Sequence, residues 1–235
     1  MIIRSLVLTA ALALAVPLAA GPTRDWTRTV VATPAGFMIG NPQAKVKLVE
    51  YGSFTCPHCR AFQKDGVPVL KAKYVATGKV SFEFRSFVRN GPDYAVSLLA
   101  GCDATAPKQA ANVELLFANQ ENWIEPFTKL DDTTAARIAA LPKDKQVAEL
   151  AKAGGLVDWM APHGLPPTKA ERCLADKAAT DKLTATLKSA VETDKVDSTP
   201  NFLIDGVRQT TDFMGQPRAI SGWAELEPRL VKALQ

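Results

Sequence analysis

The sequence of 235 residues lacks the signatures of several large classes of protein. It has no phosphate-binding glycine loop and no dinucleotide fingerprint, so it gives no sign of a nucleotide cofactor, and we expect no cofactor at all. Its net charge of +4 comes from scattered residues rather than from a basic run interleaved with aromatics, so we expect no nucleic-acid partner. With four methionines and no His/Met-rich tract, it does not resemble a dedicated copper carrier.

Long apolar runs are also missing, apart from one at the N-terminus. Arg4 precedes an apolar run from Leu6 to Ala20 that ends in small residues, which predicts a signal peptide over residues 1–21. The run is short for a membrane span, although an uncleaved anchor is the alternative. No cysteine closes it, so nothing indicates a lipid-modified cysteine. We therefore expect export to the periplasm.

Cysteine is scarce, and its spacing is informative. The four cysteines are Cys56, Cys59, Cys102 and Cys173, and only the first two are close together. A four-cysteine zinc site would need a second close pair, which the sequence does not provide. For an isolated CxxC, a structural disulfide or half of a zinc site are the alternatives to a redox pair. The four cysteines suit an oxidising compartment, and the missing second close pair favours the redox pair.

The segments around the CxxC predict a strand that leads into a helix. Val46 to Gly52 is an apolar run typical of a strand, and Arg60 to Ala76 has helical spacing of its apolar residues. Gly66 and Pro68 interrupt that spacing and predict a kink. A strand that delivers a dithiol to the start of a helix is how redox proteins of the thioredoxin type are built.

The tetrad itself predicts two unequal thiols. Pro57 suits the first position of a helix, where no N–H is needed. Cys56 then lies at the positive end of the helix dipole beside His58, and both favour its thiolate. Cys59, one turn further along, is expected to be the buried partner of the pair.

The rest of the chain predicts an α/β fold with a long helical block. A half-buried strand is expected over residues 80–85, and a strand at residues 202–204 followed by the turn Asp205-Gly206 predicts a β-hairpin. Between them the sequence offers helices but no convincing strand. The predicted segments are a signal peptide (1–21), an irregular proline-containing leader (22–43), the first part of the α/β domain (44–92), a helical insertion (93–196) and the second part of the α/β domain (197–235).

The segment Tyr51 to Cys59, with the sequence YGSFTCPHC, resembles the active-site segment of the DsbA family of bacterial thiol:disulfide oxidoreductases. The resemblance extends over most of the chain after the signal peptide. It implies a thioredoxin fold with an inserted all-helical domain, which agrees with the strand-free middle of this sequence. It also implies that Cys56, Pro57, His58 and Cys59 form the catalytic centre.

Three further residues match the family pattern. Thr199-Pro200 matches the family's cis-proline, which presents the backbone of the preceding residue to an extended substrate peptide. Glu50 matches an acidic residue that the family buries beneath the disulfide, where it could exchange a proton with Cys59; an exposed strand glutamate is the alternative. Strong oxidases of the family carry valine before the proline. Because this chain has Thr199 there, the reduction potential of those oxidases cannot be assumed for it.

Cys102 and Cys173 lie within the predicted helical block. In an exported protein, two buried thiols in one block predict a structural disulfide. A second redox pair, or two free buried thiols, are the alternatives.

Together these features predict a periplasmic, monomeric thiol:disulfide oxidoreductase. Its substrates would be exported proteins with free thiols, oxidised through a mixed disulfide on Cys56. The resemblance implies a membrane partner of the DsbB type for reoxidation. The alternatives are a disulfide isomerase or reductase, and a copper-handling protein of the same fold that binds metal through Cys56, His58 and Cys59.

Overall fold

The computed structural model describes residues 24–235, and the predicted signal peptide lies outside this range. The strands are β1 (Val30–Ala32), β2 (Gly36–Gly40), β3 (Val46–Gly52), β4 (Val80–Ser86), β5 (Asn201–Ile204), β6 (Val207–Arg208), β7 (Thr210–Phe213) and β8 (Gln216–Ala219). The α-helices are α1 (Pro57–Ala61), α2 (Val67–Leu70), α3 (Gly91–Ala100), α4 (Ala106–Ala118), α5 (Gln120–Thr128), α6 (Asp132–Ala139), α7 (Lys143–Ala153), α8 (Leu156–Met160), α9 (Pro167–Leu174), α10 (Lys177–Glu192) and α11 (Trp223–Leu234).

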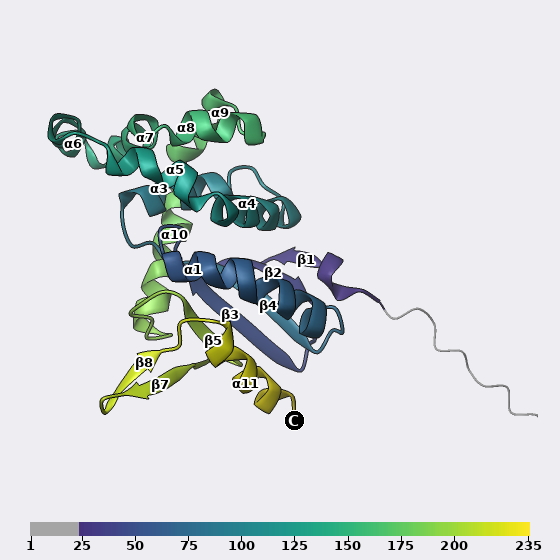
Figure 1. Ribbon diagram of the computed structural model, residues 1–235. Helices are drawn as coiled ribbons and strands as arrows, with labels where there is room; N and C mark the ends of the chain where they lie inside the picture. Colours follow the sequence, from purple (N-terminus) through teal and green to yellow (C-terminus); the bar gives the residue numbers. More distant parts are fainter. Residues whose placement is uncertain (1–23) are drawn as a thin grey trace, which may run out of the picture.

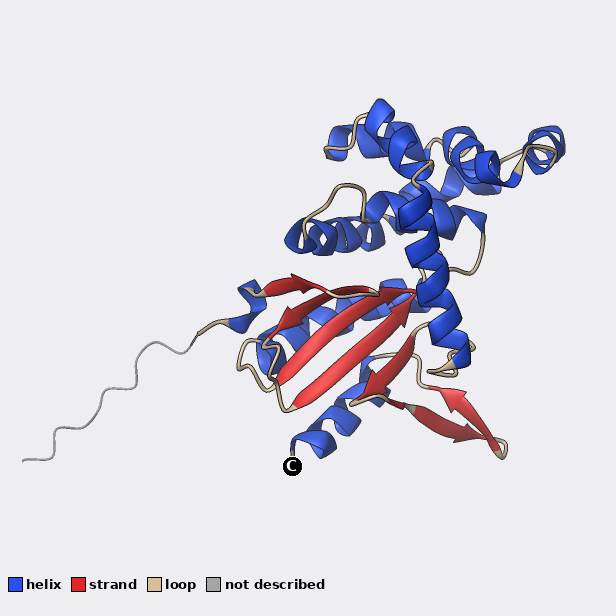
Figure 2. Ribbon diagram, turned by 180° about the vertical axis from the view of Figure 1, so that it is seen from behind, coloured by secondary structure: helices blue, strands red, loops and turns tan. Residues whose placement is uncertain are grey.

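Six strands form one sheet in the order β1-β2-β4-β3-β5-β6 (Figure 2). β3 runs parallel to β4 and antiparallel to β5, so it lies in the interior of the sheet. All of its residues except Lys47 are buried, as expected for a strand covered on both faces. The end of this central strand leads into α1, which places the CxxC at the edge of the core.

Helices cover both faces of the sheet. On one face, Phe62 from the helical segment after the CxxC packs against Phe82 of β4 and Phe202 of β5, and α11 lies beside it. On the other face, α10 runs beside the sheet (Figure 2). A smaller cluster there contains Tyr51 and Leu203 together with Ala190 of α10. Side chains on consecutive residues of β3 therefore enter two different cores.

The segment from α3 to α10 contains helices and no strand among the described residues (Figure 1). Helices α3 to α9 lie above the sheet, and α10 returns the chain to it (Figure 1). The predicted fold class, a thioredoxin fold with an inserted all-helical domain, is confirmed.

The predicted irregular leader is wrong for much of its length. β1 and β2 pair antiparallel, and β2 continues the main sheet by pairing with β4. Phe37 and Ile39 of β2 are buried in the core. Strands of three and five residues on either side of Pro34 are too short to produce a clear periodic pattern. The long-range pairing of β2 with β4 stabilises them, and β1 adds to the edge of β2.

The glycine and proline residues that interrupt the predicted elements have different effects in the helix after the CxxC and in the β-hairpin. In place of a single kink, the helix after the CxxC contains two π-helical turns, over Phe62–Gly66 and Lys71–Val75, and Pro68 lies in the α-helical turn between them. Asp205 and Gly206 both have positive φ, which confirms the predicted hairpin turn. A second hairpin, β7–β8, follows directly and was not predicted.

Cys102, just after α3, and Cys173, in α9, form a disulfide. The bridge closes a loop with a sequence separation of 71 inside the helical domain. Within residues 24–235, no helix combines the length and the apolar composition required to cross a bilayer.

We predict that the double substitution Cys102→Ala/Cys173→Ala lowers the free energy of unfolding by up to roughly 4 kcal/mol, because it releases this loop in the unfolded chain. Urea denaturation of both proteins measures the difference. The same comparison under reducing conditions, in which neither protein has the Cys102–Cys173 bridge, is the control. A change below about 0.5 kcal/mol in the Cys102/Cys173 variant would contradict a stabilising role.

Candidate active site

Cys56 is the N-cap residue of α1, directly after the loop that leaves β3. Pro57 occupies the first turn of the helix, as predicted. The backbone N–H of Cys56 donates to the Ser53 carbonyl at 3.1 Å, which folds the loop back on itself. The structure contains Cys56 and Cys59 as free thiols.

The environment of Cys56 strongly favours its thiolate. The pKa of Cys56 is lowered to about 5, first by a hydrogen bond from the Cys59 thiol, while burial opposes the shift. The Thr199 side chain and the backbone N–H groups of His58 and Cys59 lower the pKa further. These N–H groups belong to the first turn of α1, so the predicted effect of the helix N-terminus is present.

Cys59 has the opposite environment. It is completely buried, and burial raises the pKa of its thiol well above the usual range, with the Cys56 thiol and the charge of Glu50 adding to the shift. The backbone N–H of Ser53 donates to Cys59 Sγ at 3.4 Å and opposes these effects.

Glu50 is buried in the middle of β3, so the structure rules out an exposed strand glutamate. Burial raises the pKa of its carboxyl group well above the usual range, although a hydrogen bond from Gln63 Nε2 at 2.7 Å opposes the shift. The other carboxylate oxygen, Oε1, has no hydrogen-bond partner. A buried carboxyl group whose pKa is raised in this way can take up or release a proton next to Cys59.

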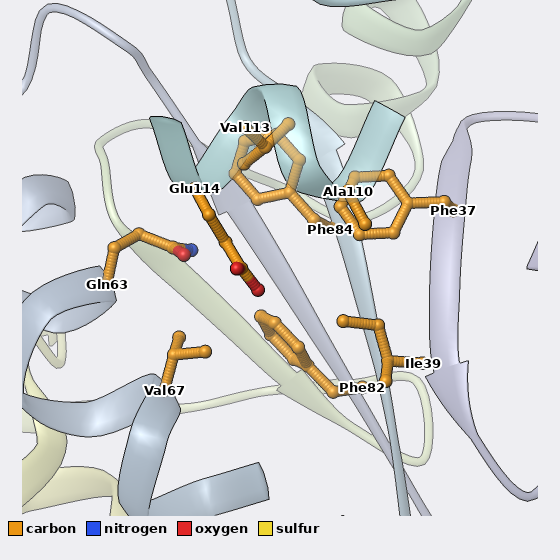
Figure 3. A pocket seen from close by; sticks show the side chains of 9 residues that line it. All are labelled: Phe37, Ile39, Gln63, Val67, Phe82, Phe84, Ala110, Val113 and Glu114. Atoms are coloured by element: carbon orange, nitrogen blue, oxygen red, sulfur yellow. The ribbon is translucent and has the colours of Figure 1, made fainter. Parts of the chain in front are cut away.

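Gln63 also lines a small cavity with Glu114, as Figure 3 shows. Apolar side chains such as Phe82, Phe84 and Val67 form most of its wall. Its volume is about 10 Å³, the size of one water molecule. The cavity is therefore too small for a substrate.

A larger groove opens at Cys56 itself. It has a volume of about 370 Å³, and its lining residues are Cys56, Pro57, His58, Phe87, Arg89, Asp197, Ser198 and Thr199. The Thr199–Pro200 peptide bond is cis. The Cys56 thiol donates to the Thr199 carbonyl at 3.3 Å, and the buried Thr199 Oγ1 has no hydrogen-bond partner.

The structure thus brings together most of the site residues predicted from the sequence. Cys56, Cys59 and Thr199 are in direct contact, and Glu50 acts on both sulfurs through its charge. His58 is exposed, and its contribution to Cys56 is a backbone N–H. Cys102 and Cys173 form their disulfide away from this group, in the helical domain.

Sequence reasoning missed two buried polar residues of the helical domain. Asp93 in α3 accepts hydrogen bonds from Ser53 and Phe54, and Gln120 in α5 donates to the carbonyls of Phe54 and Cys56. Burial raises the pKa of Asp93 to about 6. Neither residue belongs to a local motif, and each lies far from the CxxC in the sequence.

The copper-handling alternative requires a converging set of ligands. Among the residues that the structure describes, the three whose ligand atoms converge are Cys102, Asp103 and Cys173. Both cysteines of that group are in the disulfide, and Asp103 pairs with Arg172. Cys56, His58 and Cys59 are not gathered as a metal-binding set.

Comparison with known proteins places this geometry in a family. A family model described as thioredoxin matches residues 32–215, which is most of the chain. The chain belongs to the thioredoxin family. The structure of a protein-disulfide isomerase from Novosphingobium aromaticivorans is similar to this thioredoxin-family chain, with 30% identity, a TM-score of 0.75, and coverage of 84% of this chain and 96% of that one.

Two other relatives are more distant. A protein-disulfide oxidoreductase of Rickettsia bellii is 27% identical over 176 residues, and the match covers 75% of this chain but only 59% of the relative. Wolbachia pipientis alpha-DsbA1 shares the fold, with a TM-score of 0.63, 21% identity, and coverage of 87% of this chain and 93% of that one. The fold is therefore that of DsbA-type members of the thioredoxin family.

We predict that Thr199→Val raises the pKa of Cys56 above about 5, because the variant removes a hydroxyl that stabilises the thiolate. The ultraviolet absorbance of the thiolate, followed against pH, measures the change. Thr186→Val is the matched control, since the buried Thr186 hydroxyl donates to the Lys182 carbonyl within α10. Equal titration curves for Thr199→Val and the unaltered protein would refute the proposed contact.

The lowered pKa of Cys56 also makes stability depend on pH. Between pH about 5 and about 8.5, the unfolded reduced chain binds a proton at Cys56 that the folded chain does not bind. We therefore predict that the stability of the reduced form relative to the oxidised form rises with pH across this window. The stabilisation is lost as the pH falls through about 5. Denaturant titrations of both forms measure this, and a pH-independent difference would contradict it.

Proposed function

We propose that this chain is a protein thiol:disulfide oxidoreductase that donates a Cys56–Cys59 disulfide to exported proteins. The observation that carries the proposal is the contrast between the two thiols. Cys56 lines a groove, and the pKa of its thiol is strongly lowered. Cys59 is buried, and the pKa of its thiol is raised. Such a pair has one reactive thiolate at the wall of a groove, although Cys56 as a whole is only 1% exposed, and one sulfur that remains in the interior.

The reaction proceeds in two exchanges. A substrate thiolate attacks Cys56 Sγ, a substrate–Cys56 disulfide forms, and Cys59 leaves as a thiolate. Glu50 donates a proton to Cys59, since both groups have raised pKa values. A second substrate thiolate then attacks the substrate sulfur of the mixed disulfide, and Cys56 leaves as a thiolate. The substrate loses two electrons, and the CxxC gains them.

The groove suits an extended polypeptide. Thr199 lies beside Cys56, so its backbone can form main-chain hydrogen bonds with a substrate segment whose cysteine approaches Cys56. Hydrogen bonds of this kind place no demand on the substrate sequence. A range of unfolded proteins with free thiols can therefore be accepted.

The direction of transfer follows from the same contrast. Stabilisation of the Cys56 thiolate lowers the free energy of the reduced protein, and this makes its disulfide more oxidising. An oxidase is therefore favoured over an isomerase or reductase. The periplasm as location, a monomeric state and a membrane reoxidase of the DsbB type complete the proposal.

A synthetic peptide with two reduced cysteines tests the reaction. With stoichiometric oxidised protein, we predict rapid formation of the peptide disulfide. Cys56→Ser abolishes the reaction. For Cys59→Ser, Cys56 is first converted to its mixed disulfide with glutathione; the thiolate of a peptide with a single cysteine then displaces glutathione, and the peptide–Cys56 mixed disulfide accumulates. Mass spectrometry detects both products.

Two outcomes would contradict the proposal. Full oxidation of the peptide by Cys56→Ser would place the chemistry elsewhere. Faster repair of a scrambled substrate by the reduced protein than oxidation of the peptide by the oxidised protein would favour an isomerase.

A further inference from the structure

The loop between β3 and α1 is attached to the helical domain through Asp93. The Ser53 hydroxyl donates to Asp93 Oδ2 at 2.6 Å, and the backbone N–H of Phe54 donates to Asp93 Oδ1 at 2.8 Å. A third donor, the backbone N–H of Arg89, binds Oδ2 at 3.0 Å. Asp93 and Ser53 are completely buried, so water cannot replace these bonds.

Gln120, the first residue of α5, holds the same loop from a second helix. Its Nε2 donates to the carbonyl of Phe54 at 2.6 Å and to the carbonyl of Cys56 at 3.0 Å. Gln120 is only 5% exposed. One amide group therefore uses both of its N–H donors on the loop that ends at the attacked cysteine.

The loop held in this way contacts the second sulfur. The Ser53 backbone N–H, next to the hydroxyl that Asp93 binds, donates to Cys59 Sγ at 3.4 Å. The Ser53 carbonyl accepts from the N–H of Cys56 at 3.1 Å. A displacement of Ser53 would therefore affect both cysteines.

We propose that Asp93 and Gln120 are positioning residues of the redox site, which hold the Ser53–Cys56 loop so that Cys56 stays at the start of α1 and the Ser53 N–H points at Cys59 Sγ. We call these two residues the loop clamp. The inference rests on the proposed function, in which Cys56 and Cys59 are the exchanging pair. It makes the helical domain a part of the catalytic centre.

The loop clamp acts at a defined step. When a substrate thiolate attacks Cys56 Sγ, the Cys56–Cys59 bond breaks and the electron pair goes to Cys59 Sγ. The Ser53 N–H already points at this sulfur and stabilises the negative charge as it develops. Correct placement of Ser53 therefore favours departure of Cys59.

The helical domain also contains a buried polar residue that makes no hydrogen bond to the active-site loop. Asn112 in α4 is buried, and its Nδ2 donates to the Ala100 carbonyl at 3.0 Å. This bond joins two helices of the insertion and does not involve the active-site loop. Asn112 is therefore the matched control for Gln120.

The test uses variants that leave the formal charge unchanged, so that a shift reports geometry rather than a lost charge. Gln120→Met removes both donors to the loop, and Ser53→Ala removes the hydroxyl that Asp93 holds. Asn112→Leu is the control. The equilibrium of the Cys56–Cys59 pair with glutathione and the pH titration of the Cys56 thiolate are measured for each.

We expect Gln120→Met and Ser53→Ala each to become less oxidising by about fivefold or more in the glutathione equilibrium constant, with a matching rise in the pKa of Cys56. Asn112→Leu should remain within about twofold of the unaltered protein. If Gln120→Met does not fold, as judged by circular dichroism, Ser53→Ala carries the test, because it removes a single hydroxyl.

Two results would overturn the loop clamp. One is a folded Gln120→Met or Ser53→Ala protein whose equilibrium and titration match the unaltered protein. The other is an equal shift in Asn112→Leu, which would show a general effect of destabilising the insertion. Failure of the proposed function is distinguishable, because the unaltered protein would then not equilibrate with glutathione through Cys56 and Cys59.

Discussion

The structure depends on two neighbouring sulfurs that experience opposite environments. The pKa of Cys56 is lowered by the Cys59 thiol, by the Thr199 side chain and by backbone N–H groups at the start of α1, all of which favour its negative charge. Cys59, one helical turn away, is buried next to Glu50, where a negative charge is costly. The strand β3 makes this contrast possible, because it carries Glu50 into the core and leads through a buried loop to the start of α1.

The same contrast explains why the loop before Cys56 must be held so firmly. A buried backbone group without a partner costs free energy, and a loop that moved would also move the donors around both sulfurs. The polar groups of the Ser53–Cys56 loop are paired with Asp93 and Gln120. The helical insertion thus covers the sheet from above and also supplies the buried polar side chains that hold the loop.

Much of the site could be predicted because its information is local. The CxxC, Pro57 and the strand before them form one continuous segment, and Thr199-Pro200 directly precedes β5. Asp93 and Gln120 could not be predicted, because their partners lie about 39 and 64 positions away and no spacing rule connects them. The strands β1 and β2 were missed for a related reason, since the pairing of β2 with β4 and of β1 with β2, rather than their own sequence, makes them strands.

The central claim is that the two thiols titrate far apart in the reduced protein. Carbon NMR of cysteine labelled at the β-carbon follows each thiol separately as the pH changes. The structure predicts that the Cys56 thiol titrates near pH 5. The Cys59 thiol should stay protonated until the pH is well above the usual pKa of a cysteine. Two cysteines that both titrate near about 8.5, as unperturbed thiols do, would contradict the account.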